Sequence, residues 1–102
     1  MADTLTFFRE YLPQKIAENQ DLLQIGAVYQ FDIDGAGTWT LDLVKGEVRE
    51  APAEEPGCVI TVAKEHWDQV IDQPMMATQF FMMGQLKASN LALALQLQRI
   101  LG

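Results

Sequence analysis

The residues that could do acid–base chemistry are few in this chain. His66 is the only histidine, and it stands beside Glu65 and near Asp68. A histidine paired with a carboxylate can act as a general base, but adjacent residues on a helix point in different directions and do not pair. We therefore interpret His66 as a helix-surface side chain and expect no catalytic residue.

Metal binding is disfavoured on similar grounds. Cys58 is the only cysteine, and one cysteine with one histidine cannot complete a zinc site, so we expect no metal and no cofactor. At the start of a predicted strand, a single cysteine most often behaves as a small buried hydrophobe. It also cannot form an internal disulfide, and nothing therefore indicates secretion.

Three carboxylates form the remaining candidate for chemistry. Asp32 and Asp34 alternate with apolar residues on one predicted strand, and Asp42 lies on the next. A hairpin could bring the three together, but the alternation also predicts that they share the solvated face of a half-buried sheet. We favour the second interpretation. The sequence contains no glycine-rich phosphate loop, nucleophile elbow or zinc motif.

The charge balance excludes several partners. The formal net charge is −7, and the seven basic residues are scattered singly along the chain. Nucleic acids and anionic membranes are bound by clusters of Lys and Arg, so we expect neither as a partner. There is no signal peptide and no apolar run of the length that spans a bilayer. These features predict a cytoplasmic protein without stable membrane insertion.

Residues 75–83 are unusually apolar. They contain four of the five methionines together with Phe80 and Phe81. Methionine is unbranched and polarizable, so a cluster of this kind can line a cavity that accepts ligands of variable shape. The alternative interpretation is that these side chains belong to an ordinary hydrophobic core. Because the segment is more apolar than a domain of this size can easily cover, we favour a cavity wall or a partner surface.

Periodicity predicts one α+β domain over residues 1–102. Apolar residues at Phe8, Leu12 and Ile16 mark a first helix that Asp3 or Thr4 can cap, and Pro13 is expected to kink or split it. Period-two alternation then predicts short strands, the first four of them antiparallel. The predicted strands are 29–34, 38–43, 47–51, 58–63 and 85–88.

Helices are predicted to follow the fourth strand. Residues 64–73 form a helix ended by Pro74, and residues 75–83 form a short one ended by Gly84. Residues 91–101 are ambiguous, because Leu91 and the alternate leucines after it repeat as in a strand. Ala, Leu and Gln are strong helix formers, and we therefore predict a single last helix with Ser89 or Asn90 as its cap.

Together these segments resemble the sterol carrier protein type-2 family over about residues 5–102. The run Phe-Met-Met-Gly-Gln-Leu-Lys at 81–87, followed by a helix of Leu, Ala and Gln, is the most specific match. The strand Trp-Thr-Leu-Asp-Leu at 39–43 supports it, as do Tyr-Gln-Phe-Asp-Ile-Asp-Gly at 29–35 and Val-Ile-Thr-Val at 59–62.

The resemblance implies a five-stranded, mainly antiparallel sheet covered by helices on one face and enclosing a hydrophobic tunnel. Members of the family bind fatty acids, fatty acyl-CoA, sterols or other lipids without covalent chemistry. Placed on this chain by motif and period, the tunnel wall is predicted to contain nine residues: Trp67, Ile71, Met75, Met76, Phe80, Phe81, Met83, Leu91 and Leu95.

Some departures from the family pattern indicate which kind of family member to expect. The glycine that usually follows the helix carrying Trp67 is missing, and Ser89-Asn90 replaces the usual glycine-aspartate pair before the last helix. Residues 99–102 do not match the peroxisomal address of many eukaryotic members. We therefore expect a compact bacterial-type member, not an enzyme, that carries a fatty acid, acyl-CoA or related lipid as a monomer or homodimer. The alternative is a dimerisation or substrate-presenting module that uses residues 75–83 and the last helix as a partner surface.

Overall fold

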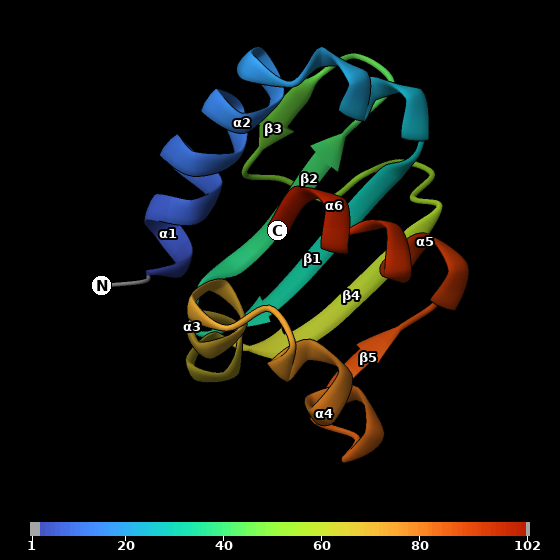
Figure 1. Cartoon of the computed structure of the whole chain (residues 1–102). Coiled ribbons are helices and arrows are strands. Elements are labelled where there is room, and N and C mark those ends of the chain that lie inside the picture. Colours follow the sequence, from blue (N-terminus) through green and yellow to red (C-terminus); the bar gives the residue numbers. More distant parts are fainter. Residues whose placement is uncertain (1–2, 102) are drawn as a thin grey trace.

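The computed structural model describes residues 3–101 and contains one sheet with its helices (Figure 1). The strands are β1 (Val28–Asp34), β2 (Gly37–Asp42), β3 (Glu47–Arg49), β4 (Cys58–Ala63) and β5 (Leu86–Ala88). The helices are α1 (Thr4–Thr6), η1 (Phe7–Tyr11), α2 (Leu12–Glu18), η2 (Gln20–Ile25), α3 (Lys64–Asp72), α4 (Met76–Met82), α5 (Leu91–Gln96) and α6 (Gln98–Leu101).

The sheet has the order β3-β2-β1-β4-β5. Every neighbouring pair is antiparallel except the central pair, β1 and β4, which runs parallel with Tyr29 opposite Cys58. The predicted five-stranded, mainly antiparallel sheet is therefore confirmed, but the expectation that the first four strands are all antiparallel is wrong. Alternation identifies a strand without identifying its partner, because it reports only which face is buried.

The N-terminal helix runs through Pro13 without splitting. Asp3 caps it, with its carboxylate accepting a hydrogen bond from the backbone N–H of Thr6. Phe7 and Leu12, at the two junctions between α1, η1 and α2, keep helical backbone angles. The π-helical turn η1 ends two residues before Pro13, and the N–H of Leu12 bonds to the carbonyl of Phe7, five residues back. A widened turn thus accommodates the proline that was expected to kink or split the helix.

A cluster of five buried aromatic rings, which we call the aromatic cluster, joins this helix to the sheet. It consists of Phe7, Phe8, Phe31, Trp39 and Trp67. Phe8 stacks on Trp39 with ring centroids 5.0 Å apart and meets the edge of Phe31 at 5.1 Å. Trp67 extends the cluster to α3 through contacts with Phe7 and Phe31.

The opposite face of the sheet carries the three carboxylates. Asp32 accepts a hydrogen bond from Gln30, Asp34 is exposed, and Asp42 accepts bonds from the backbone N–H groups of Val44 and Lys45. These two N–H groups, that of Lys45 above all, lower the pKa of Asp42. Asp32 and Asp42 are thus engaged in local hydrogen bonds. Within residues 3–101 no three His, Cys, Asp or Glu side chains form a metal site. No described helix is long and apolar enough to cross a membrane.

Candidate ligand cavity

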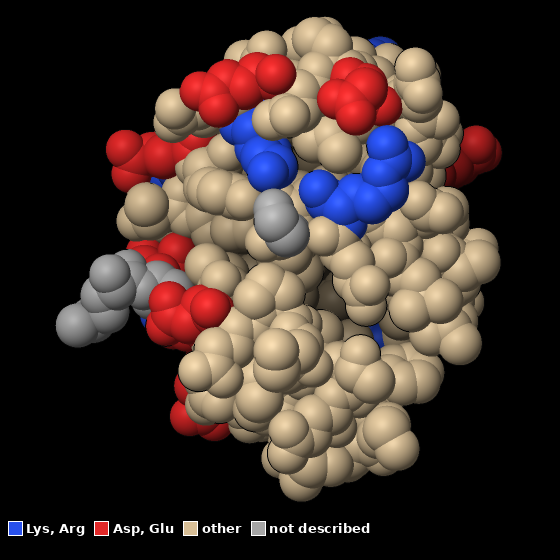
Figure 2. All heavy atoms as spheres, in the orientation of Figure 1, with Lys and Arg blue, Asp and Glu red and all other residues tan. Residues whose placement is uncertain are grey.

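An apolar cavity lies between the β4–β5 edge of the sheet and the last four helices. Its volume is about 60 Å³, and a hollow is visible near the middle of the face shown in Figure 2. Among the described residues, Gln98 is the single polar side chain that lines it. The lining residues are Ile60, Trp67, Pro74, Ala77, Phe81, Leu86, Ala88, Leu91, Ala94, Leu95, Leu97, Gln98 and Leu101.

The floor of the cavity comes from two paired strands. Ile60 of β4 stands opposite Ala88 of β5, and Leu86 stands opposite Val62. Residues two apart on a strand share a face, so this register places Ile60, Leu86 and Ala88 together under the helices. Since Ile60 and Leu86 are buried, the floor belongs to the core.

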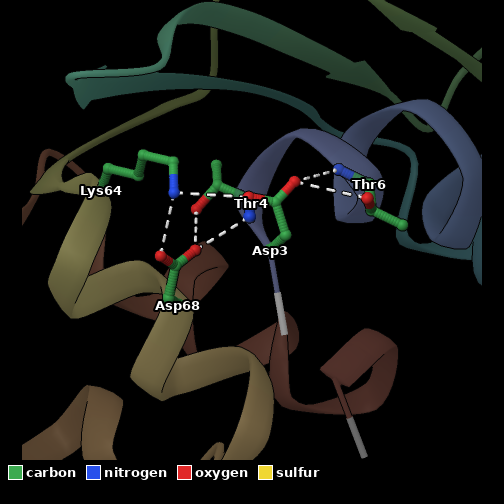
Figure 3. Close-up of polar contacts among 5 residues, drawn as sticks. All are labelled: Asp3, Thr4, Thr6, Lys64 and Asp68. Atoms are coloured by element: carbon green, nitrogen blue, oxygen red, sulfur yellow. Dashed lines mark hydrogen bonds and ion pairs between the residues drawn. The ribbon is translucent and has the colours of Figure 1, made fainter. Parts of the chain in front are cut away.

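Trp67 forms the wall on α3, which a polar clamp fixes to the N-terminal helix (Figure 3). The carboxylate of Asp68 accepts hydrogen bonds from the backbone N–H and the hydroxyl of Thr4, at 2.8 and 2.6 Å. Lys64 Nζ lies 3.1 Å from Asp68 and 3.3 Å from Asp3. Hydrogen bonds to these two carboxylates raise the pKa of Lys64, Asp68 contributing most. The clamp holds the tryptophan wall in one position.

Two polar atoms beside this wall are buried without a hydrogen-bond partner in the described part of the chain. They are Trp67 Nε1 and His66 Nδ1. The ring of His66, which was expected on the helix surface, packs on Phe80 with centroids 4.6 Å apart, and the residue is half-buried. A general base is normally oriented by a hydrogen-bonded partner, and Nδ1 of His66 has none.

The wall formed by α5 is attached more loosely. The helix begins at Asn90, whose side chain accepts a hydrogen bond from the backbone N–H of Leu93, and none of its residues is buried. Tyr29 on β1 donates a 2.7 Å hydrogen bond to the carbonyl of Leu93. Burial raises the pKa of Tyr29 to about 12, with a smaller contribution from Cys58, so the hydroxyl keeps its proton and the bond persists at neutral pH.

The last helix is broken, which corrects the prediction of one continuous helix. It divides at Leu97 into α5 and α6. Leu97 and Ile100 are buried, whereas Leu91 and Leu95 line the cavity and remain more than half exposed, at 53% and 55%. The exposed leucines of α5 thus lie at the open side of the cavity.

The nine predicted wall residues fall into two groups. Four of them line the cavity from three different helices: Trp67, Phe81, Leu91 and Leu95. The other five lie outside its lining. Phe80 is buried, Ile71 and Met76 are half-buried, and Met75 and Met83 are exposed. As ligand contacts, all nine stay predictions.

Other lining residues were not predicted as site residues. The floor residues Ile60, Leu86 and Ala88 occupy alternate strand positions, so the period of two could have indicated them. Ala94 follows Leu91 at helical spacing, which was the available signal for α5. A small residue such as Ala77 carries no recognisable signal, because an alanine is as frequent in an ordinary core as at a cavity.

A second depression, on the other face of the sheet, is wider but polar. It has a volume of about 540 Å³ and contains Asp42, Lys45, Arg49, Glu54 and Glu55. Charges of both signs line it, and it is open to solvent. The smaller cavity is the candidate site because small-molecule sites are mostly apolar with few polar groups.

Comparisons with known proteins agree with this fold. The model of the SCP-2 sterol transfer family matches residues 8–102. No curated protein sequence gave a significant match.

Solved structures are similar over nearly the whole chain. Sterol carrier protein domain 2 of Helicoverpa armigera shares 17% identity with a TM-score of 0.79, covering 98% of this chain and 86% of the other. Palmitated SCP2L2 of Aedes aegypti shares 18% identity with a TM-score of 0.75, over 99% and 95%. Apo sterol carrier protein 2 of Yarrowia lipolytica shares 24% identity with a TM-score of 0.71, over 92% and 83%.

At these identities the structural likeness establishes the fold. The family model adds the family, because it spans most of the chain, including all five strands and α3 to α6. The chain therefore belongs to the SCP-2 sterol transfer family.

Proposed function

We propose that this protein binds a lipid with a long hydrocarbon chain, such as a fatty acid, in the cavity beneath α4 and α5. The observation that carries the proposal is the lining, which is apolar except for Gln98. Apolar surface favours a hydrocarbon ligand by about 0.8 kcal/mol for each methylene removed from water. The similarity to an A. aegypti protein solved in its palmitated form supports the same ligand class.

Ligand uptake requires the cavity to widen. A cavity of about 60 Å³ has room for roughly four waters and no room for a chain of sixteen carbons. Burying fourteen methylenes would stabilise the complex by roughly 10 kcal/mol before the cost of opening is subtracted. Since α5 has no fully buried residue and packs on the core only through the partly buried Leu93 and Ala94, moving it outward breaks few core contacts. We propose that the ligand enters by displacing α5 from the sheet.

A free fatty acid or neutral lipid fits the surroundings better than acyl-CoA. Within residues 73–98, which include α4, β5 and α5, Lys87 is the single charged residue. Phosphate groups are usually held by clusters of Lys and Arg, and acyl-CoA carries several of them. We further propose that binding involves no covalent chemistry, that residues 1–102 act as one domain and that the protein works in the cytoplasm.

Native mass spectrometry of the purified protein tests the proposal, followed by titration with palmitate. We expect up to one bound lipid per chain. A matched pair of variants locates the site: Ala94→Glu places a carboxylate in the cavity wall, whereas Ala92→Glu adds the same charge to an exposed position on the same helix. Palmitate binding should be lost in the first variant and kept in the second. A protein that stays free of ligand after incubation with fatty acids and acyl-CoA would contradict the proposal.

A second candidate is a dimerisation or substrate-presenting module. Exposed methionines at Met75, Met82 and Met83 favour it, because a surface of this kind can bury against a partner chain. Light scattering after size exclusion separates the two candidates. A tight dimer that takes up no palmitate supports the module, whereas a monomer that binds palmitate supports the carrier.

A further inference from the structure

We propose that the protein docks on membranes of zwitterionic lipid through an exposed apolar surface around the cavity mouth. This surface, called the apolar tip, consists of Met75, Phe81, Met82, Met83, Leu91 and Leu95. The proposal rests on the proposed lipid-binding function, because docking at this position would place the cavity against the source of its ligand.

The apolar tip is unusually exposed for its composition. Met75 and Met82 are 79% and 80% exposed, and their spacing of seven residues puts them on one side of the helical segment. Phe81 and Met83 adjoin Met82 in the chain. Monomeric proteins rarely leave contiguous apolar surface of this kind in water unless it contacts a partner or a membrane.

Charge distinguishes a zwitterionic membrane from other partners. Residues 73–98 contain one of the chain's 21 charged residues, Lys87, so this segment has a charge of +1 and the rest of the chain −8 (−7 minus +1). Figure 2 shows no acidic or basic side chain over α4 on the visible face. Bringing a charged side chain into a bilayer costs free energy, and none of the residues of the apolar tip is charged. An anionic membrane would instead repel the remaining acidic surface.

Continuity with the cavity favours a lipid surface over a protein partner. Phe81, Leu91 and Leu95 are exposed on the tip and also line the cavity. A hydrocarbon chain that left the bilayer beneath them could pass into the cavity without crossing water. Exposure to water would oppose the transfer by about 0.8 kcal/mol for each methylene, so a mouth lying on the bilayer removes the main barrier to exchange.

Flotation with vesicles of pure phosphatidylcholine tests the proposal. The wild-type protein should float with the vesicles to the same extent at low and high salt, since apolar contacts are not screened as charges are. Replacing part of the phosphatidylcholine with phosphatidylserine should weaken binding. Met82→Glu, which puts a charge on the tip, should lower the partition coefficient at least tenfold.

Val44→Glu is the matched control. Val44 is also an exposed apolar residue, at 62%, and it lies in the turn between β2 and β3, at the opposite edge of the sheet from β5. Both variants change the net charge by the same amount. Val44→Glu should float as the wild type does, and both variants should bind palmitate in solution with unchanged affinity.

Other outcomes would overturn the proposal. The docking surface is refuted if the wild type does not float, or if the two variants lose binding equally. A dimer that Met82→Glu dissociates, without any flotation of the wild type, would assign the tip to a second copy of this chain. Failure of the proposed function would give a different result: the wild-type protein would not bind palmitate in solution but would still float with the vesicles.

Discussion

The N-terminal helix and the α4–α5 region both contribute large apolar side chains, but they pack them differently. Phe7 and Phe8 are buried within the aromatic cluster, with stacked and edge-on contacts to neighbouring rings. Phe81, Met82 and Leu95 are largely in contact with solvent or the cavity. Aromatic rings have few rotamers and fill a fixed space, whereas methionine adapts to changing surroundings. One region therefore provides stability and the other can rearrange around a ligand.

The strongest test of this comparison exchanges one phenylalanine in each region for alanine. Phe8→Ala should lower the free energy of unfolding by about 3–5 kcal/mol, because it leaves a cavity in the core. Phe81→Ala should lower it by less than about 1 kcal/mol, since the side chain is already 39% exposed, but it should weaken palmitate binding. Urea unfolding and a palmitate titration measure the two effects. Equal losses of stability would remove the distinction between the regions.

Palmitate binding should stabilise the protein, and a larger side chain that occupies part of the cavity should reduce this effect. Palmitate at a concentration of about 100 times its Kd should raise the free energy of unfolding by about 2.7 kcal/mol. Ala94→Leu adds three carbons to the cavity wall and should weaken palmitate binding, so the increment at the same palmitate concentration should shrink. Thermal unfolding with and without palmitate gives both values. An undiminished increment in Ala94→Leu would place the ligand elsewhere.

The attachment of α5 can be loosened on its own. Tyr29→Phe removes the hydrogen bond to the carbonyl of Leu93 and should cost about 1 kcal/mol. Hydrogen exchange should accelerate at the amides of α5 and remain slow in the N-terminal helix, because the lost bond is local to the cavity wall. Uniform acceleration across the chain would show that α5 does not open independently.

The smallest predicted effect is a pH dependence of the free energy of unfolding, which arises from Asp42, outside the α4–α5 region. Backbone N–H groups of Lys45 and Val44 lower the pKa of Asp42 in the folded state. Its carboxylate therefore stabilises the protein above the pKa of the unfolded chain, about 3.9, and this contribution is lost as the pH falls through the folded-state value. Asp42→Asn should lower stability at neutral pH by less than about 1 kcal/mol.

At strongly acidic pH the same substitution should have no effect, because Asp42 is then protonated in the wild type as well. Thermal unfolding of both proteins across the acidic range measures the difference. A difference that persists below the folded-state pKa would mean that the side chain stabilises the turn by its shape and not by its charge.

Much of the fold could be predicted from local signals in the sequence. The bounds of β4 and the alternation of Tyr29, Phe31 and Ile33 in β1 follow from residue type and period. Residue type also limits the two helix caps to two neighbouring candidates each, among them the observed Asp3 and Asn90. The parallel pairing of β1 with β4 could not be predicted, since it depends on a tertiary arrangement that no strand encodes by itself. The π-helical turn before Pro13 was missed for a similar reason: proline marks a disruption without specifying its form.

The candidate site was less predictable. The methionine-rich segment indicated adaptable apolar surface, but a seven-residue helix that is apolar almost all round does not define which side faces inward. Phe81 of this helix lies on the cavity, whereas Met75 and Met83 at its two ends are exposed to solvent. The floor depends on the pairing of β4 with β5, which is again a tertiary feature.

The parallel central pair also has a kinetic consequence. In the β1–β2 hairpin, Ile33 pairs with Gly37, so this contact closes a very short loop. Tyr29, by contrast, pairs with Cys58 and reaches Leu93 across 64 residues. Distant contacts stabilise the chain only after the entropy of loop closure has been overcome. We therefore expect the hairpin to form early in folding and α5 to pack against the sheet last. The helix that packs last in folding is then also the one that we expect to detach first from the folded protein.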